Sequence, residues 1–236
     1  MSGSGIRLDL HNHTRYSPDG LMSPEELLLV AKARGVDCLA VTDHDCVEGA
    51  LRAYALAETE ASLPRVIPGI ELSTTAGEII GLYVFEPIPA NLPLAEAMEQ
   101  IRAQGGLVYL PHPYDLLRRG AVTRSHREEA AQLADIVEVL NGRSLGPRAS
   151  GKAARLARRL GKPAGAGSDA HRASEVGSTY VVVSACPSRE TLLSLLRQGS
   201  VQSRLGPRGY TVNWGLQGLA PVTRVRRRLL RDLTGR

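Results

Sequence analysis

Histidine and acidic side chains follow most of the short apolar runs in this chain. Five of its six histidines come just after such a run: His11, His13, His44, His112 and His171. Carboxylates accompany them: Asp43, Asp45, Glu71 and Asp169. Imidazole and carboxylate groups together are typical ligands of Zn²⁺, Mn²⁺ and Fe²⁺. The pattern indicates a metal site assembled from several distant parts of the chain.

Two short segments have a spacing that suits chelation. His11 and His13 are two residues apart, and so are Asp169 and His171. On extended backbone, such pairs point to the same side. A single histidine at a strand end is more often a polar surface residue than a ligand. Five in this pattern are difficult to obtain by chance, so we favour a metal centre.

Short apolar runs alternate with helical segments along the chain. Strands are expected at 7–10, 38–42, 66–70, 78–85, 107–110, 136–140, 164–166 and 179–183, the fourth returning through a turn at 74–77. Helices are expected at 24–34, 47–60, 93–104, 128–133, 149–160 and 189–198. This alternation predicts parallel βα units. Barrels of such units hold their active sites at the C-terminal ends of the strands, where the histidines would meet.

The composition fits a single globular domain inside the cell. The length is 236 residues, of which 43% are apolar. The N-terminus lacks the basic and apolar regions of a signal peptide, and no apolar stretch approaches the roughly 20 residues of a membrane span. Three scattered cysteines indicate free thiols in a reducing compartment. We therefore expect a cytoplasmic protein with no membrane partner.

The C-terminal extension, residues 206–236, is strongly basic. Its segment 224–231 holds five arginines, and the whole chain has a net charge of +5. A contact with nucleic acid is one interpretation. A solvated helix face is the favoured one, because no aromatic residues alternate with the charges as in single-strand binding surfaces.

Five short motifs occur in a characteristic order. They are HNHT at 11–14 with SPDG at 17–20, TDHD at 42–45, PGIE at 68–71, PHP at 111–113 and GSDAH at 167–171. In type and order they resemble the motifs of the PHP (polymerase and histidinol phosphatase) family. The resemblance implies an α/β fold, a distorted (β/α)7 TIM-like barrel of the PHP type. We assign this single domain to residues 1–205.

The resemblance also implies a site with two or three divalent ions per chain, Mn²⁺, Zn²⁺ or Fe²⁺. It assigns to the first metal His11, His13, Glu71 and Asp169. It makes Glu71 a bridge to a second metal, which His112 also binds. It assigns Asp19, His44 and His171 to the third metal. Asp19 rests on the resemblance alone, because Pro18-Asp19-Gly20 otherwise resembles a turn.

One position departs from the family pattern. Glu78 precedes Ile79-Ile80-Gly81, where members of the family commonly have a histidine. Glu78 is either a carboxylate ligand of the second metal or an exposed residue, and the sequence favours neither. The segment between Gly81 and His112 has room for one helix and one strand, without the inserted domain of many nucleotide-hydrolysing relatives. We therefore expect an open site and transfer no nucleotide specificity.

Together these features predict a phosphoesterase that uses a metal-activated hydroxide. Glu71 and Asp169 are the expected catalytic carboxylates, and Arg143, just after a strand, is the preferred phosphate ligand. Further candidate arginines follow the strand of His112: Arg118, Arg119, Arg124 and Arg127. The favoured substrate is a small phosphomonoester, of a metabolite or nucleotide. A phosphodiesterase or exonuclease acting on nucleic acid and a non-catalytic metal-binding module remain alternatives, and the oligomeric state stays open.

Overall fold

The computed structural model describes residues 5–115, 120–144 and 147–204. The strands in these ranges are β1 (Ile6–Asp9), β2 (Cys38–Val41), β3 (Arg65–Thr74), β4 (Gly77–Leu82), β5 (Leu107–Leu110), β6 (Ile136–Asn141), β7 (Ala164–Gly167), β8 (Thr179–Val183) and β9 (Ser200–Ser203). The helices are α1 (Pro24–Ala33), α2 (Glu48–Thr59), α3 (Leu94–Ala103), α4 (Arg127–Leu133), α5 (Pro147–Arg159) and α6 (Leu192–Gln198). The predicted basic extension at 206–236 lies outside the described residues.

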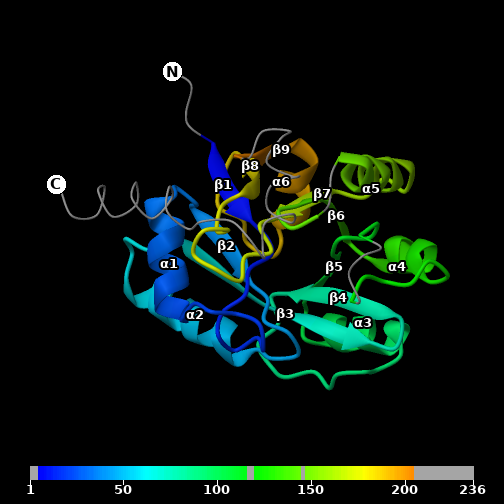
Figure 1. Cartoon of the computed structure of the whole chain (residues 1–236), viewed down its shortest axis with the longest axis horizontal. Helices are drawn as coiled ribbons and strands as arrows, with labels where there is room; N and C mark the ends of the chain where they lie inside the picture. The colour runs from blue at the N-terminus through cyan, green and yellow to red at the C-terminus, as the bar shows by residue number, and fades with distance from the viewer. Residues whose placement is uncertain (1–4, 116–119, 145–146, 205–236) are drawn as a thin grey trace, which may run out of the picture.

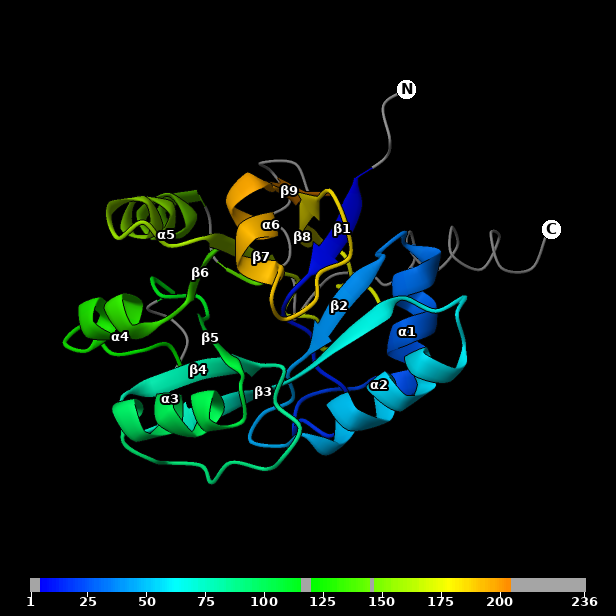
Figure 2. The same ribbon diagram turned by 180° about the vertical axis from the view of Figure 1, so that it is seen from behind.

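The strands form one curled sheet in the order β7-β6-β5-β4-β3-β2-β1-β8-β9. The sheet curls until β7 approaches β1, where the Leu10 N–H donates to the Ala166 carbonyl at 3.1 Å and the Asp169 N–H to the His11 carbonyl at 2.7 Å. The result is a nearly closed barrel with helices outside it (Figure 1, and from behind Figure 2). The predicted TIM-like α/β barrel is confirmed, and the structure is consistent with one domain.

The prediction of parallel βα units holds for only part of the sheet. β1, β2 and β3 are parallel, and so are β5, β6 and β7. β4 is antiparallel to both neighbours, because β3 returns through the short turn at Thr75 and Ala76. β8 and β9 are also antiparallel, and β9 was not predicted. Such a hairpin extends β3 to Thr74, so Glu71 lies within this strand and not after it.

Burial of apolar side chains follows the barrel plan. One cluster gathers buried residues from all the strands β1 to β8 and fills the barrel; Leu8, Ile67, Tyr109 and Ile136 belong to it. Two further clusters join the helices to the outer face of the sheet. At the start of α1, Ser23 Oγ accepts a hydrogen bond from the Glu26 N–H at 3.1 Å, the predicted N-cap.

Two other predictions concern the whole chain. The three cysteines are free thiols, as expected. Among the residues that the structure describes, none of the helices has the length and apolar character needed to cross a membrane.

Candidate metal centre

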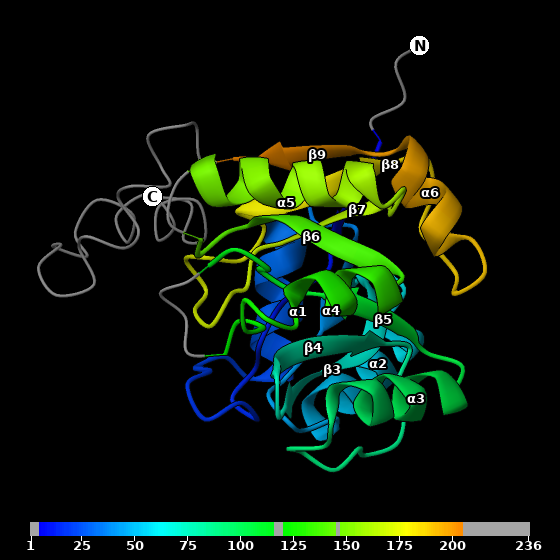
Figure 3. The ribbon, with the colours of Figure 1, turned by 90° about the vertical axis from the view of Figure 1, so that its right-hand side faces the viewer.

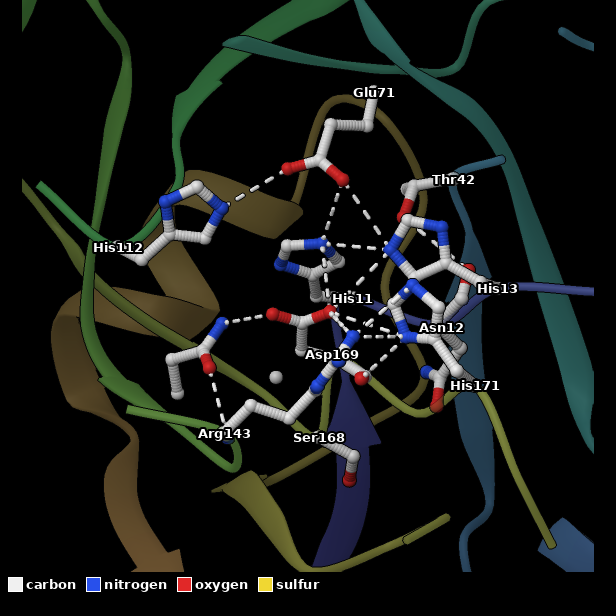
Figure 4. A network of polar contacts seen from close by, with 12 residues as sticks. His11, Asn12, His13, Thr42, Glu71, His112, Arg143, Ser168, Asp169 and His171 are labelled. Atoms are coloured by element: carbon white, nitrogen blue, oxygen red, sulfur yellow. Dashed lines mark hydrogen bonds and ion pairs between the residues drawn. The ribbon is translucent and has the colours of Figure 1, made fainter. Parts of the chain in front are cut away.

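Four predicted ligands of the first metal meet at one end of the barrel. The Nε2 atoms of His11 and His13 are 3.1 Å apart. Glu71 Oε2 is 3.2 Å from the first of these atoms and 3.3 Å from the second. Asp169 Oδ1 lies 3.8 Å from His11 Nε2 and 3.5 Å from His13 Nε2. Figure 4 shows these groups pointing toward one another, from the segments that follow β1 and β7 and from β3. The convergence that we expected from the barrel plan is present.

Glu71 has the geometry of a bridging carboxylate. Its Oε2 faces His11 and His13, whereas its Oε1 lies 3.1 Å from His112 Nε2. The Glu71 carboxylate is almost completely buried, with a side-chain exposure of 1%. Each oxygen therefore belongs to a different group of potential ligands, as expected if this residue joins a first and a second metal.

The groups predicted for the third metal also lie together, on the open side of the site. His171 Nε2 is 3.0 Å from Asp19 Oδ2, and His44 Nε2 is 3.8 Å from Asp19 Oδ1. The ring of His171 stacks on that of His13 at a centroid distance of 4.1 Å. Asp19 is the most exposed of these side chains, at 55%. Among the described residues, three sets of possible ligands each have their atoms within 4.8 Å of one another: His11 with His13 and Asp169, His11 with Glu71 and His112, and His13 with His44 and His171.

Glu78 projects from β4 toward the same centre. Its Oε2 lies 3.7 Å from His112 Nε2 and its Oε1 lies 3.9 Å from His44 Nδ1. The side chain is 18% exposed. A Cβ at Gly120 would overlap the Glu78 carboxylate, so this glycine leaves the space that the carboxylate occupies. Glu78 is therefore close enough to serve the second metal with only a small movement.

A buried glutamate that the sequence analysis missed orients the inner histidines. Glu138 Oε1 accepts hydrogen bonds from His11 Nδ1 at 3.2 Å and from the Tyr109 hydroxyl at 2.9 Å. Its Oε2 accepts from the His112 N–H at 2.7 Å and from Asn141 Nδ2 at 3.0 Å. An acidic residue in the middle of the apolar strand β6 was the available signal. Such outer partners fix the tautomer and orientation of metal-ligating histidines.

A second outer partner is Asp43. Ser17 Oγ donates to Asp43 Oδ1 at 2.7 Å, which leaves its lone pairs to accept from His13 Nδ1 at 3.0 Å. Asp43 also accepts from the Thr14 N–H and hydroxyl, both at 2.7 Å. Its neighbour Asp45 binds Ser73 instead, at 2.6 and 2.8 Å. These two carboxylates support the loops of the site and contribute no atom to the three ligand sets.

The donor set fits a divalent cation. His11 and His13 donate from Nδ1 to Glu138 and Ser17, so their Nε2 atoms carry lone pairs, and these face each other at 3.1 Å. Two such lone pairs repel unless a cation or a proton lies between them. Burial lowers the pKa of His13, but hydrogen bonds from its ring to the Asp169 and Glu71 carboxylates outweigh this and raise the pKa to about 9. The pKa of His11 is also raised, because the Asp169, Glu71 and Glu138 charges outweigh burial.

Strained backbone places two of the ligands. His112 has a φ of 28° and Asp169 a φ of 52°, both in the left-handed region that side chains rarely adopt. Strain of this kind persists where the surroundings impose it, often at functional sites. At β7, a Cβ on Gly167 would lie 2.2 Å from His11 Cβ, so the close approach of β7 to β1 requires glycine. The sequence motifs around these residues therefore set the backbone conformation as well as supply the candidate ligands.

Arg143, the predicted phosphate ligand, lies beside two of the candidate metal ligands. Its Nη1 is 2.7 Å from His171 Nδ1 and 3.8 Å from Asp169 Oδ1, and its side chain is 25% exposed. Its backbone N–H donates to Asn141 Oδ1 at 2.9 Å. The other candidate arginines have different places. Arg124 and Arg127 line a separate cavity, and Arg118 and Arg119 lie outside the described residues.

Sequence comparison assigns the family. The family model described as PHP domain matches residues 9–141, and one described as PHP-associated matches residues 147–201. The chain belongs to the PHP family. The resemblance inferred from the five motifs is confirmed, and the fold is that of PHP-like metal-dependent phosphoesterases. The histidine and carboxylate clusters of this chain suit metal binding.

Curated PHP relatives differ in how much of them this chain covers. An uncharacterized protein of Methanocaldococcus jannaschii is 35% identical over 179 residues, 75% of this chain and 70% of that protein. The 5'-3' exoribonuclease Rnm of Salmonella typhimurium is 33% identical over 151 residues, 54% of this chain and 51% of that protein. A 3',5'-nucleoside bisphosphate phosphatase of Chromobacterium violaceum is 38% identical over 99 residues, 40% of this chain and 33% of the phosphatase. The chain thus spans about half or less of these two relatives with named activities.

Solved structures agree on the fold. A two-domain protein of Bacteroides vulgatus, described as containing a predicted PHP-like metal-dependent phosphoesterase, has a TM-score of 0.64 at 19% identity, over 84% of this chain and 64% of that one. An amidohydrolase of Chromobacterium violaceum with bound sulfate has a TM-score of 0.60 at 21% identity, over 83% of this chain and 97% of that one. At these identities the likeness concerns the PHP barrel alone.

Proposed function

We propose that this PHP protein hydrolyses a phosphomonoester of a small metabolite or nucleotide with the help of two or three bound divalent ions. The observation that carries the proposal is the paired Nε2 lone pairs of His11 and His13, 3.1 Å apart and backed by a bridging Glu71. The open outer side of the centre, with His44 24% and Asp19 55% exposed, favours a catalytic site over a non-catalytic metal-binding module, whose ligands would close around the ion. The named activities of two relatives, an exoribonuclease and a bisphosphate phosphatase, are both hydrolyses of phosphate esters.

Each ligand group has a proposed metal. The first metal would be bound by His11, His13, Glu71 and Asp169. The second would be bound by Glu71 and His112, with Glu78 as a further ligand. The third would be bound by Asp19, His44 and His171. Divalent ions in such a site supply Lewis-acid chemistry, lowering the pKa of water and neutralising phosphoryl oxygens. Imidazole-rich groups suit Zn²⁺, Mn²⁺ or Fe²⁺.

The protein's own residues position the ester. Asn141 Nδ2 donates to Asp169 Oδ2 at 2.9 Å, which turns the other oxygen, Oδ1, toward the centre. There Asp169 can accept a hydrogen bond from the attacking water and orient it. Arg143 lies on the rim beside it, where a guanidinium can bind two phosphoryl oxygens at once. Glu71, Asp169 and Arg143 are therefore the proposed catalytic residues.

A direct assay tests this proposal. Protein reconstituted with Mn²⁺ should hydrolyse a chromogenic phosphomonoester faster than the matching diester, and chelation with EDTA should abolish the activity. Metal analysis should give two or three equivalents per chain. Less than one equivalent after reconstitution with Mn²⁺, Zn²⁺ or Fe²⁺ would contradict the metal centre. Faster hydrolysis of the diester would replace the monoesterase proposal by a phosphodiesterase.

A further inference from the structure

Two cysteines lie together at the end of the barrel opposite the metal centre. Cys38 is the first residue of β2, whose other end leads to the candidate ligand His44. Cys186 follows β8 by three residues, and β8 runs antiparallel to β1, with Val183 opposite Ile6. The end of β8 and the start of β2 therefore both lie where β1 begins. Figure 3 shows α6 and the turn that leads into it at the end of the barrel away from the loop after β1.

The two thiols are in contact. Cys38 is a buried member of the apolar cluster that fills the barrel, and Cys186 packs against this cluster as a partly buried residue. The Cys38 thiol, 1% exposed, donates a hydrogen bond to the Cys186 sulfur. Both residues are free cysteines. A disulfide needs Cβ atoms about 4 Å apart, so two thiols in contact are already close to the required arrangement.

The two sulfurs differ in protonation. The hydrogen bond from Cys38 lowers the pKa of the Cys186 thiol to about 7, against the effect of burial. The positive charge of Arg65, which lies opposite Cys38 in β3, also lowers this pKa, whereas the charge of Asp37 opposes it. The same hydrogen bond raises the pKa of Cys38. Near neutral pH, Cys186 therefore carries the thiolate of the pair and Cys38 the proton.

Access from solvent follows the same division. Cys186 lies in the irregular segment between β8 and α6 and is partly exposed, and its neighbours Ser184 and Ala185 are exposed. Cys38 is closed off by the barrel. A solvent-accessible thiolate beside a second cysteine is the arrangement typical of redox-sensitive sites. An oxidant in solution reaches Cys186 first, and Cys38 reacts only through it.

We propose that Cys186 and Cys38 form a reversible disulfide when the protein meets a peroxide, with Cys186 as the attacking cysteine and Cys38 as the resolving one. The Cys186 thiolate attacks a peroxide oxygen, an S–O bond forms, the O–O bond breaks, and the departing hydroxide takes up a proton to give water. The Cys38 sulfur then attacks the sulfenic sulfur of Cys186. An S–S bond forms, the S–O bond breaks, and the Cys38 proton leaves with the hydroxide as water. Two electrons pass from the sulfurs to the peroxide, and a thiol reductant reverses the reaction by exchange.

The disulfide joins β2 to the segment before α6 and closes a loop of about 150 residues. Such a bond stabilises the folded barrel, chiefly because it restricts the unfolded chain. It also keeps the oxidation of Cys186 reversible, because a sulfenic acid that is not captured by a thiol proceeds to the irreversible sulfinic acid. Since the metal centre lies at the other end of the barrel, ester hydrolysis stays the same.

Thiol mapping after peroxide treatment tests the proposal. The full chain is loaded with Zn²⁺, which has no redox chemistry of its own, and treated with a small excess of hydrogen peroxide. Free thiols are then alkylated and located by peptide mass mapping. The third cysteine, Cys46, is an internal reference, because it is also partly exposed but donates to Glu48 Oε2 at 2.8 Å, an acceptor that favours the protonated thiol.

The wild type should lose two of its three free thiols and yield a peptide pair linked through Cys38 and Cys186, and dithiothreitol should restore all three. Cys46→Ser, the matched control, should form the same disulfide. Cys38→Ala should stop at a Cys186 sulfenic acid that dimedone traps, and Cys186→Ser should leave Cys38 reduced. Three free thiols after treatment, a disulfide that includes Cys46, or Cys186 sulfinic acid beside a reduced Cys38 in the wild type would each overturn the proposal.

Thermal unfolding gives a second measurement that does not depend on the buried Cys38 variant. The oxidised wild type should unfold roughly 5–10 °C above the reduced protein, whereas the partly exposed Cys186→Ser variant should show no shift on oxidation. Hydrolysis of the chromogenic monoester should be equal in the oxidised and reduced wild type. An oxidised wild type with the same unfolding temperature as the reduced protein would contradict the bond across the barrel end.

Discussion

The two halves of the metal centre differ in burial and in how firmly they are held. The inner half, His11, His13, Glu71 and Asp169, has side-chain exposures of 0 to 1%. The outer half is open, with exposures of 18% for Glu78, 24% for His44 and 55% for Asp19. Glu138 and Ser17 hold the Nδ1 atoms of the inner His11 and His13, whereas the outer His44 and His171 contact the exposed carboxylate of Asp19.

Electrostatics follow the same division. Carboxylates raise the pKa of the inner His13 to about 9 against the effect of burial. In the outer His44, burial outweighs the nearby carboxylates and lowers the pKa. The carboxylates of the inner half therefore favour a positive charge, a proton or a metal ion, at its histidines. The lowered pKa of His44 favours the neutral imidazole, which is the form that binds a metal. We infer that the inner half fixes the metals and that the outer half meets the substrate.

The largest expected effect separates Glu71 from Glu78. Glu71→Gln should lower kcat on the order of 10³-fold, because an amide offers one good acceptor in place of two charged oxygens that face two ligand groups. Glu78→Gln should cost far less, since its oxygens lie 3.7 and 3.9 Å from the nearest histidines. Steady-state kinetics of both variants with saturating Mn²⁺ measure this. Equal losses would mean that the bridge is wrongly placed.

Glu138 tests whether the inner half depends on its outer partner. Glu138→Gln should reduce metal affinity or activity by roughly 10- to 100-fold, because the His11 tautomer is then no longer imposed. Competition with a metal chelator measures the affinity. Glu99→Gln, an exposed position on α3, is the matched control and should behave as the wild type. If chelator competition gives the same affinity for both, the proposed role of Glu138 is refuted.

Arg143 lies on the border between the halves. Arg143→Lys should raise KM or lower kcat for phosphate esters by several-fold while the metal content stays unchanged. Lysine keeps the charge but loses the planar pair of donors that binds two oxygens. Kinetics combined with metal analysis of the same preparation give the answer. Activity near that of the wild type would reduce Arg143 to a surface residue.

The smallest effect is expected at Asp19. Burial raises its pKa, but the hydrogen bond and charge of His171 outweigh this and hold the pKa well below its usual range. Asp19 is therefore ionised at any working pH. Because exposed ion pairs contribute only about 0–1 kcal/mol, Asp19→Asn should lose at most one metal equivalent and less than about tenfold in kcat. A loss as large as that of Glu71→Gln would remove the distinction between the halves.

The strands and the ligand types could be predicted from the chain alone. Each predicted strand and helix is present in the structure, because apolar periodicity and the cap at Ser23 are local signals. His11, His13 and Asp169 were identified since their spacing and their places after strands are written in the sequence. The order of the motifs supplied Asp19, which local reasoning would have assigned to a turn.

Only the tertiary structure decided which carboxylates face the candidate metal ligands and which ones support the surrounding loops. Asp43 follows β2 and Glu71 lies within the neighbouring β3, yet in sequence both are acidic residues just after an apolar run. In the structure Asp43 accepts hydrogen bonds from Ser17 and Thr14, whereas Glu71 faces the candidate metal ligands. Glu138 has no motif, and its role exists only because the curled sheet brings β6 opposite β1. The antiparallel β4, which places Glu78 at the centre, depends on pairing with β5, a contact between residues far apart in sequence. Sequence spacing determines which side chains can bind a metal, whereas long-range packing determines which of them meet.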